Sequence, residues 1–185
     1  MGRPKKFNRE EVLDKTIPIF WKHGLAETTV QDLERATGVN KSGLYAEFEN
    51  KEDLFVASLS RYFEVLQERG SLTKQPLGWP NIEAFLKVCE GSWGQKGCFS
   101  VNSMREFPDL PHQARELMIG SAKQLKRELV RNISAARGKS APNNDALAGL
   151  VLTFFSGICL EQNLGPSEKQ IAEKIAQFMR LIRAI

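Results

Sequence analysis

The chain has 185 residues, of which 42% are hydrophobic and 26% charged, with 14 glycines and 8 prolines. These values are ordinary for globular proteins, and they exclude disordered, collagen-like and disulfide-scaffold chains. The formal net charge of +4 is too small to indicate a polyanionic partner by itself. No apolar run reaches the ~20 residues of a membrane span, and no apolar signal-peptide core follows the basic N-terminus. We therefore expect a cytoplasmic protein with no membrane partner.

Enzymatic and metal chemistry find little support in the residue pattern. Cys89, Cys98 and Cys159 are widely spaced and lack the C-x-x-C pairs of a structural zinc site, so we expect reduced thiols. His23 and His112 have no Ser, Cys or carboxylate at a recognised catalytic spacing. We predict no enzyme activity, no cofactor and no metal.

The first helix is expected to begin at Asn8, which forms a capping-box-like pair with Glu11. Apolar residues then recur at helical spacing until Gly24, where the helix should close. Pro18 lies inside this segment and removes one backbone donor, so we expect a kink near its middle or a tightened last turn.

Two short helices follow, separated by a tight turn. Thr29 caps the first, and Gly38 ends it where a left-handed residue is least costly. Asn40 is a suitable cap for the second, which we predict over residues 41–48. The pair forms a helix-turn-helix, in which the second helix fits the DNA major groove.

The rest of the chain also has helical patterns, with no competing strand pattern, so the fold class is all-α. A fourth helix is expected from Asn50 to about Gly70, and the turn-rich stretch 70–80 marks the domain junction. Further helices are predicted over residues 82–93, 98–107, 114–137, 145–164 and 167–185. We divide the chain into an arm and helix-turn-helix domain (1–50), a connecting helix (51–69) and a larger helical domain (70–185).

Three strings of the N-terminal part carry a specific resemblance. They are TTVQDL from Thr28, ATGVNKSGLYAEF from Ala36 and NKEDLF from Asn50. Over residues 8–66 the chain closely resembles the DNA-binding domain of TetR-type transcriptional repressors. The resemblance implies a three-helix DNA-binding domain followed by a larger helical domain for ligand binding and dimerisation.

The resemblance also implies which residues contact DNA. They are Thr29, Gln31, Asn40, Lys41, Ser42, Gly43, Tyr45 and Lys51, together with Arg3 and Lys5 of the N-terminal arm. Thr29, Tyr45 and Lys51 resemble the phosphate contacts, which set register rather than choose sequence. As an alternative, Thr29 and Asn40 could be present only as helix caps.

Three further residues of the N-terminal part matter for the resemblance to TetR-type repressors. Gly43 costs ~1 kcal/mol relative to Ala in a first helical turn, which we interpret as close approach to DNA. Pro18 and Glu34 depart from the family pattern, and Glu34 is tolerable if it faces solvent.

A repressor of this type binds a near-palindromic operator as a dimer. The two C-terminal helices resemble the family's dimerisation bundle, and their apolar positions extend over more than one face. The predicted dimerisation residues are Phe155, Ile158, Ile175, Phe178, Met179 and Ile182. The alternative is that both helices are simply core.

The family usually carries a pocket for a small-molecule inducer in the larger domain. Candidate pocket residues are Trp93, Cys98, Phe99, Asn102, Ser103, Phe107, Phe154 and Phe155, and ordinary core is the alternative for the aromatic ones.

The sequence thus predicts a sequence-specific DNA-binding regulator whose partners are an operator duplex, an unidentified inducer and a second copy of itself. A ligand-responsive repressor is the favoured form. The alternatives are a thiol- or metal-sensing regulator acting through Cys98, and a module that binds DNA or protein without sequence selectivity.

Overall fold

The computed structural model describes residues 7–87 and 94–185. Within these ranges the chain is helical and contains no β-strand, which confirms the all-α prediction. The elements are α1 (Arg9–Glu27), α2 (Val30–Thr37), α3 (Lys41–Leu44), α4 (Lys51–Arg69), α5 (Trp79–Lys87), α6 (Phe99–Ser103), the 3-10 helix η1 (Met104–Asp109), α7 (His112–Arg137), α8 (Asn144–Gln162) and α9 (Glu168–Arg183).

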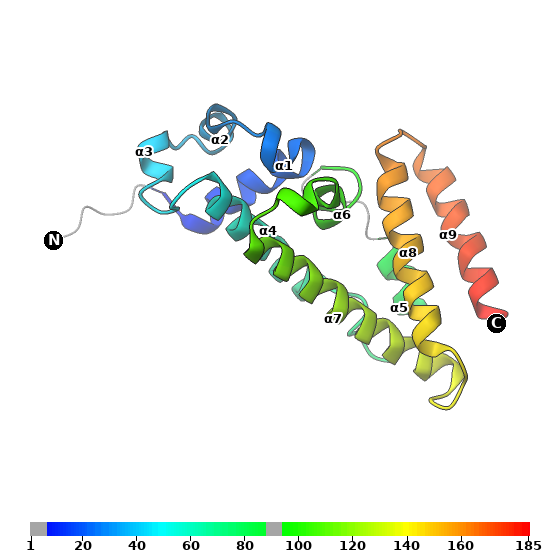
Figure 1. The fold of residues 1–185 in the computed structure, drawn as a ribbon. Helices are drawn as coiled ribbons and strands as arrows, with labels where there is room; N and C mark the ends of the chain where they lie inside the picture. Colours follow the sequence, from blue (N-terminus) through cyan, green and yellow to red (C-terminus); the bar gives the residue numbers. More distant parts are fainter. Residues whose placement is uncertain (1–6, 88–93) are drawn as a thin grey trace.

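The short helices α2 and α3 lie at one end of the molecule, and α8 and α9 run side by side at the other (Figure 1). The long helix α7 extends between the two ends. Helix α1 packs on α4 and also on α6, and α6 in turn packs on α8. The C-terminal part therefore touches the helix-turn-helix unit directly, through α6 and α1.

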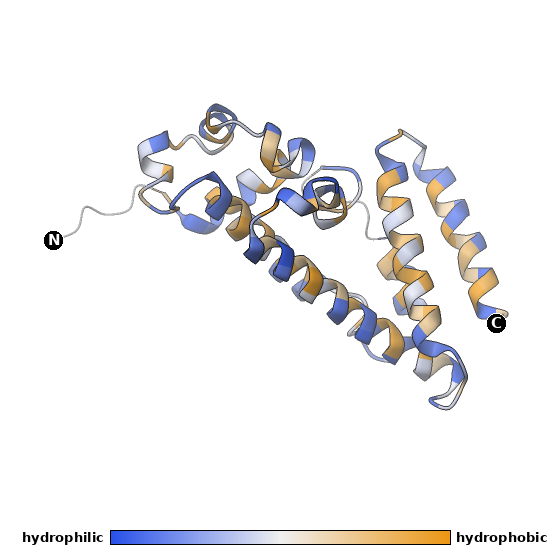
Figure 2. Cartoon of the chain, in the orientation of Figure 1, coloured by the Kyte–Doolittle hydropathy of each residue, from blue (hydrophilic) through white to orange (hydrophobic). Residues whose placement is uncertain are grey.

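Helix α8 is unusually apolar, and Figure 2 draws most of it in orange to white, whereas α7 has a hydrophilic side. By length and mean hydropathy alone, α8 would also suit a membrane span. A core helix of a folded domain meets the same criterion, and α8 packs against α6, α7 and α9.

Helix α1 breaks at Gly24 and not at Pro18, which corrects the predicted kink. Gly24 is the residue of α1 with non-helical angles, at φ 79° and ψ −179°, a region that L-residues essentially do not occupy. The break frees the amides of Leu25 and Ala26, and both donate to the carboxylate of Glu106 in η1, at 2.8 and 2.9 Å. A Cβ at Gly24 would overlap that carboxylate. Pro18 is accommodated without a break, and the expected end at Gly24 becomes a bend in a helix that continues to Glu27.

Helix α3 is shorter than predicted, because it ends at Leu44 instead of residue 48. After Leu44 the amide of Glu47 bonds to the carbonyl of Leu44, three residues back, which tightens the chain into a turn. This turn leads to Asn50, whose side chain accepts from Asp53 and caps α4 as predicted.

Together with buried Asn81 of α5, Asn132 of α7 holds the loop between α4 and α5, and Asn132 is 0% exposed. Its Oδ1 accepts from the amide of Gly78 and from Asn81 Nδ2, each at 3.0 Å. Its Nδ2 donates to the carbonyls of Leu72 and Glu128, at 2.8 and 2.9 Å. The amide of Asn132 is thus saturated, and it ties the loop to α5 and α7.

Candidate nucleic-acid interface

Helix α2 begins with a complete capping box. The hydroxyl of Thr29 accepts from the amide of Asp32 and donates to its carboxylate at 2.6 Å, while the amide of Thr29 donates to the same carboxylate. Hydrogen bonds from the hydroxyl and amide of Thr29 lower the pKa of Asp32 below its ordinary value. Thr29 therefore serves as a cap. A phosphate contact at Thr29 stays a prediction, and it would have to share the hydroxyl with Asp32.

The turn and the start of α3 are fixed by side chains from both helices. Gly38 ends α2 in the left-handed conformation, and Oδ1 of Asn40 accepts from the amide of Gly43 at 2.8 Å. The carboxylate of Glu34 accepts from the amide of Lys41. Glu34 is thus half-buried rather than solvent-facing, because it helps cap the first turn of α3.

Three of the predicted contact residues project from these two helix starts into solvent. Gln31 of α2 and Lys41 and Ser42 of α3 are exposed. Tyr45, directly after α3, is half-buried, and Lys41 Nζ lies 5.8 Å from its ring centroid. The surface formed by Gln31, Lys41, Ser42 and Tyr45 is called the reading surface below. It lies at the end of the molecule remote from α8 and α9 (Figure 1).

Gly43 has an explanation within the protein itself, beside the close approach to DNA, which stays a prediction. A Cβ at Gly43 would lie 2.7 Å from Cγ1 of Val39 and 3.1 Å from Oδ1 of Asn40. Any larger residue would therefore push against a stiff β-branched side chain and against the cap of α3.

Lys51 also has an internal role. Its Nζ donates to the carbonyl of Thr28 at 2.9 Å and to that of Ala26 at 3.4 Å, so it ties the start of α4 to the segment between α1 and α2. A phosphate contact by Lys51 stays a prediction. Arg3 and Lys5 lie outside the described residues.

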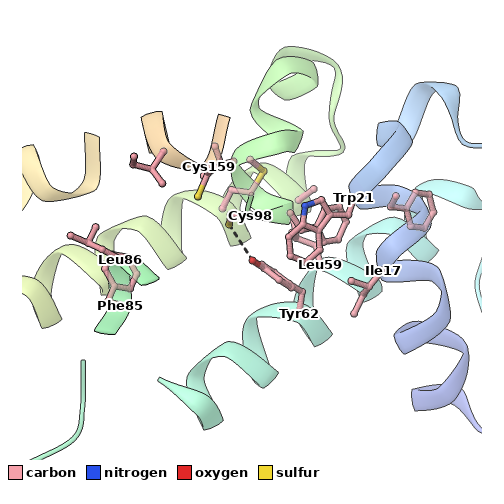
Figure 3. Packing of buried hydrophobic residues seen from close by; sticks show 14 of the residues in the cluster. Ile17, Trp21, Leu59, Tyr62, Phe85, Leu86, Cys98 and Cys159 are labelled. Carbon is pink, nitrogen blue, oxygen red and sulfur yellow. Dashed lines mark hydrogen bonds between the residues drawn. The ribbon is translucent and has the colours of Figure 1, made fainter. Parts of the chain in front are cut away.

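Within residues 7–87 and 94–185, the predicted inducer residues lie in separate places. Phe99 is fully buried, with the rings of Trp21, Phe55 and Tyr62 packed around it at centroid distances of 6.2, 5.5 and 5.6 Å. The Tyr62 hydroxyl donates to Sγ of Cys98 at 3.2 Å (Figure 3), and burial raises the pKa of Tyr62 well above its ordinary value. This cluster is close-packed core.

The other predicted inducer residues lie elsewhere. Phe154 stacks on Phe178 of α9 at 3.8 Å, while Phe155 stacks on Phe85 of α5 at 4.5 Å. Buried Ser103 donates to the carbonyl of Phe99, Phe107 is half-buried in η1, and Trp93 lies outside the described residues. Phe99 and Phe155 therefore pack on buried rings, which favours the core interpretation for these two, whereas Phe154 and its partner Phe178 are both half-buried.

An open cleft of about 610 Å³ lies where α1, α6, η1 and the end of α8 meet. Among the described residues that line it, Asn102 is the one predicted inducer residue. Its charged members, Lys22, Lys96 and Arg105, come from three separate segments. Sequence reasoning missed them because isolated exposed cations carry no spacing signal, and only the fold brings them together.

Four of the six predicted dimerisation residues are buried within the protomer. They are Ile158, Ile175, Met179 and Ile182, each at most 3% exposed, whereas Phe155 and Phe178 are half-buried. The four buried residues can support an interface but cannot form its outer surface. Exposed leucines and isoleucines lie on and directly after the same two helices. They are Leu150, Leu160, Leu164, Leu181 and Ile185, between 47% and 86% exposed.

Sequence comparisons identify relatives along most of the chain. Residues 12–58 match the model of a family described as bacterial regulatory proteins, tetR family. The HTH-type transcriptional repressor ComR of Escherichia coli is 31% identical over 192 residues, which span 97% of this chain and 91% of ComR. The uncharacterized HTH-type transcriptional regulator YezE of Bacillus subtilis is 36% identical over 78% of each chain.

Solved structures share the fold over nearly the whole chain. A cysteine variant of the TetR family regulator CifR, in complex with 26-base-pair double-stranded operator DNA, gives a TM-score of 0.82 at 17% identity. The match covers 97% of this chain and 98% of CifR. A TetR transcriptional regulator from Chloroflexus aurantiacus gives 0.79 at 26% identity, with 94% and 93% covered.

Proposed function

This chain belongs to the TetR family of bacterial transcriptional regulators, and we propose that it is a repressor that binds a near-palindromic operator as a homodimer and is released by a small molecule. Like its relatives, it is a DNA-binding regulator, and it is not an enzyme. The cytoplasm, where the operator is, is its proposed location.

The observation that carries the proposal is the reading surface. Its exposed side chains belong to α2 and α3, and a side-chain cap fixes the first turn of each helix. The positions of these side chains are therefore set in the DNA-free protein. Amide and hydroxyl groups such as those of Gln31 and Ser42 can hydrogen-bond base edges in the major groove, and Lys41 can contact a base or a phosphate.

The apolar surface of α8 and α9 supports the dimer. Leu150 and Leu181 are 56% and 68% exposed, and a hollow of about 390 Å³ beside Phe154 and Phe178 lies between the two helices. Exposed apolar side chains around such a hollow are typical of an interaction site. A second copy would place two reading surfaces about one DNA turn, ~34 Å, apart.

Selection of bound fragments from a random DNA pool by the purified protein tests the proposal. We expect enrichment of one sequence with two inverted half-sites, bound ~10³-fold or more tighter than unrelated DNA at the same salt concentration. Enrichment without a common sequence would identify a non-selective DNA-binding module instead. Enrichment of a single half-site would contradict the symmetric dimer.

Variants of the reading surface test which residues do the reading. Ser42→Ala should weaken binding to the selected operator by roughly 1–3 kcal/mol and relax preference at one base position. Lys123→Ala, an exposed cation on α7, is the matched control, and its affinity should equal that of the unmodified protein. Unchanged affinity and preference in Ser42→Ala would remove that residue from the interface.

A further inference from the structure

The cleft beside α1 has a consistent charge. Lys22, Lys96 and Arg105 line it, and no carboxylate from the described residues does. None of these three cations forms an ion pair with another residue in the ranges 7–87 and 94–185. Arg105 donates through Nε to the carbonyl of Asn102 at 3.3 Å, which orients the guanidinium and leaves its terminal nitrogens available. The local field therefore favours an anion.

The wall that carries Lys96 is held in place from three sides. The carbonyl of Lys96 accepts from the indole of Trp21 at 3.0 Å and from Nδ2 of Asn102 at 3.3 Å. The next amide, of Gly97, donates to Oε1 of Gln162 at 2.7 Å. Such preorganisation reduces the entropy that ligand binding would otherwise cost.

The cleft also offers hydrogen-bonding and apolar groups. Asn102 is 9% exposed, and its Oδ1 accepts from Nδ2 of Asn163, so two amides form part of the lining. Leu160, 47% exposed, adds an aliphatic side chain at the rim. A volume of about 610 Å³ falls in the range of small-molecule sites.

The cleft joins the two functional parts of the chain. Trp21 and Lys22 belong to α1, which carries the helix-turn-helix, while Asn102 and Arg105 belong to α6 and η1. Arg105 directly precedes Glu106, whose carboxylate holds α1 at its break. A ligand that spans the cleft would contact both parts, so its binding free energy depends on how they are placed relative to one another.

We propose that this cleft binds a small organic anion, a carboxylate or a phosphate ester with an apolar body, and that this anion is the effector of DNA binding. The charged group contacts Arg105, Lys96 and Lys22, and the apolar body lies toward Leu160. The second half of this statement rests on the proposed function, whereas binding in the cleft does not.

Calorimetric titration of the DNA-free protein tests the site with three small aromatic probes. Benzoate and phenyl phosphate represent the two anionic groups, and benzamide is the neutral control. We expect at least one anion to bind about tenfold or more tightly than benzamide. The preferred anion distinguishes a carboxylate effector from a phosphate effector. Equal binding of all three probes, or no heat at millimolar concentration, would overturn the proposal.

Variants place the anion in the cleft. In Arg105→Gln combined with Lys96→Gln, the affinity for the preferred anion should fall about tenfold or more. Arg127→Gln, an exposed cation on α7 outside the cleft, should bind as the unmodified protein does. Circular dichroism verifies that each variant is folded. If the double variant does not fold, Lys22→Gln replaces it, because the Lys22 side chain is exposed and forms no hydrogen bond or ion pair within the described residues. Undiminished affinity in the folded cleft variant would place the anion elsewhere.

The effect on DNA is measured separately. The preferred anion should change affinity for the selected operator in the unmodified protein but not in the cleft variant. Operator binding without anion tests the proposed function alone. Anion binding without any effect on operator affinity would retain the site and reject the effector role.

Discussion

At the residue scale, the contact between Gly24 and Glu106 is one of the tightly constrained points of the described structure. Gly24→Ala should destabilise the protein by about 2–4 kcal/mol, because the φ of +79° is strained for alanine and the new Cβ would overlap the Glu106 carboxylate. Urea unfolding followed by circular dichroism measures the loss.

Gly138→Ala is the matched control for this prediction. Gly138 has a similar φ of +98°, but no atom lies within 4 Å of a Cβ built there, so this variant should cost only the backbone strain, about 1–2 kcal/mol. Equal losses in the two variants would mean that the Glu106 carboxylate moves aside freely.

At the scale of elements, Asn132 determines how the loop between α4 and α5 is ordered. Asn132→Ala leaves the Gly78 amide and the Leu72 carbonyl without their buried partner, and it should cost about 2–4 kcal/mol. Limited proteolysis should then cut within residues 70–78. Lys123→Ala on the exposed side of α7 should change neither the unfolding midpoint nor the cleavage pattern.

Local signals were sufficient for most helix boundaries. The caps at Thr29 and Asn50 could be predicted because an N-cap and its partner lie within three residues of one another. Asn8 also caps its helix as predicted, but through the amide of Glu10 and not in a pair with Glu11. The hydrogen bonds of Asn132 could not be predicted from the sequence. Three of its partners lie 51–60 residues away, and the fourth is a backbone carbonyl one turn back. Glu106 was missed for the same reason, because it lies 81 and 80 residues from the two amides that it binds.

The candidate sites likewise include one that local sequence predicts and one that only the folded chain brings together. The residues of the reading surface are close together in the chain and carry a specific motif, so sequence alone placed them on two adjacent helix starts. The cationic cleft depends on α1, α6 and α8 meeting in space, while Phe99 and Phe155, which were proposed for a pocket, pack on buried rings. Composition cannot distinguish a buried aromatic from one that lines a cavity.

At the scale of the whole molecule, the exposed apolar residues of α8 and α9 predict the oligomeric state. Leu181→Asp should give a folded monomer with weakened operator affinity, because Leu181 is 68% exposed and its loss leaves the protomer core intact. Light scattering coupled to gel filtration measures the mass. An aspartate at exposed Ala176, about 140° around the helix, is the matched control and should remain dimeric. A dimer in Leu181→Asp would place the interface on another surface.

The hydrogen bonds between Glu106 and the amides that follow the break in α1 have a consequence for protein engineering. A chimaera that transplants residues 1–50 onto the C-terminal part of a relative exchanges the partner of the Leu25 and Ala26 amides. Where the recipient has no hydrogen-bond acceptor at this position, the transplanted domain should be poorly fixed to the C-terminal part. Ligand binding should then no longer change its affinity for DNA, even if the domain still recognises its own operator. Supplying a glutamate there should restore the response.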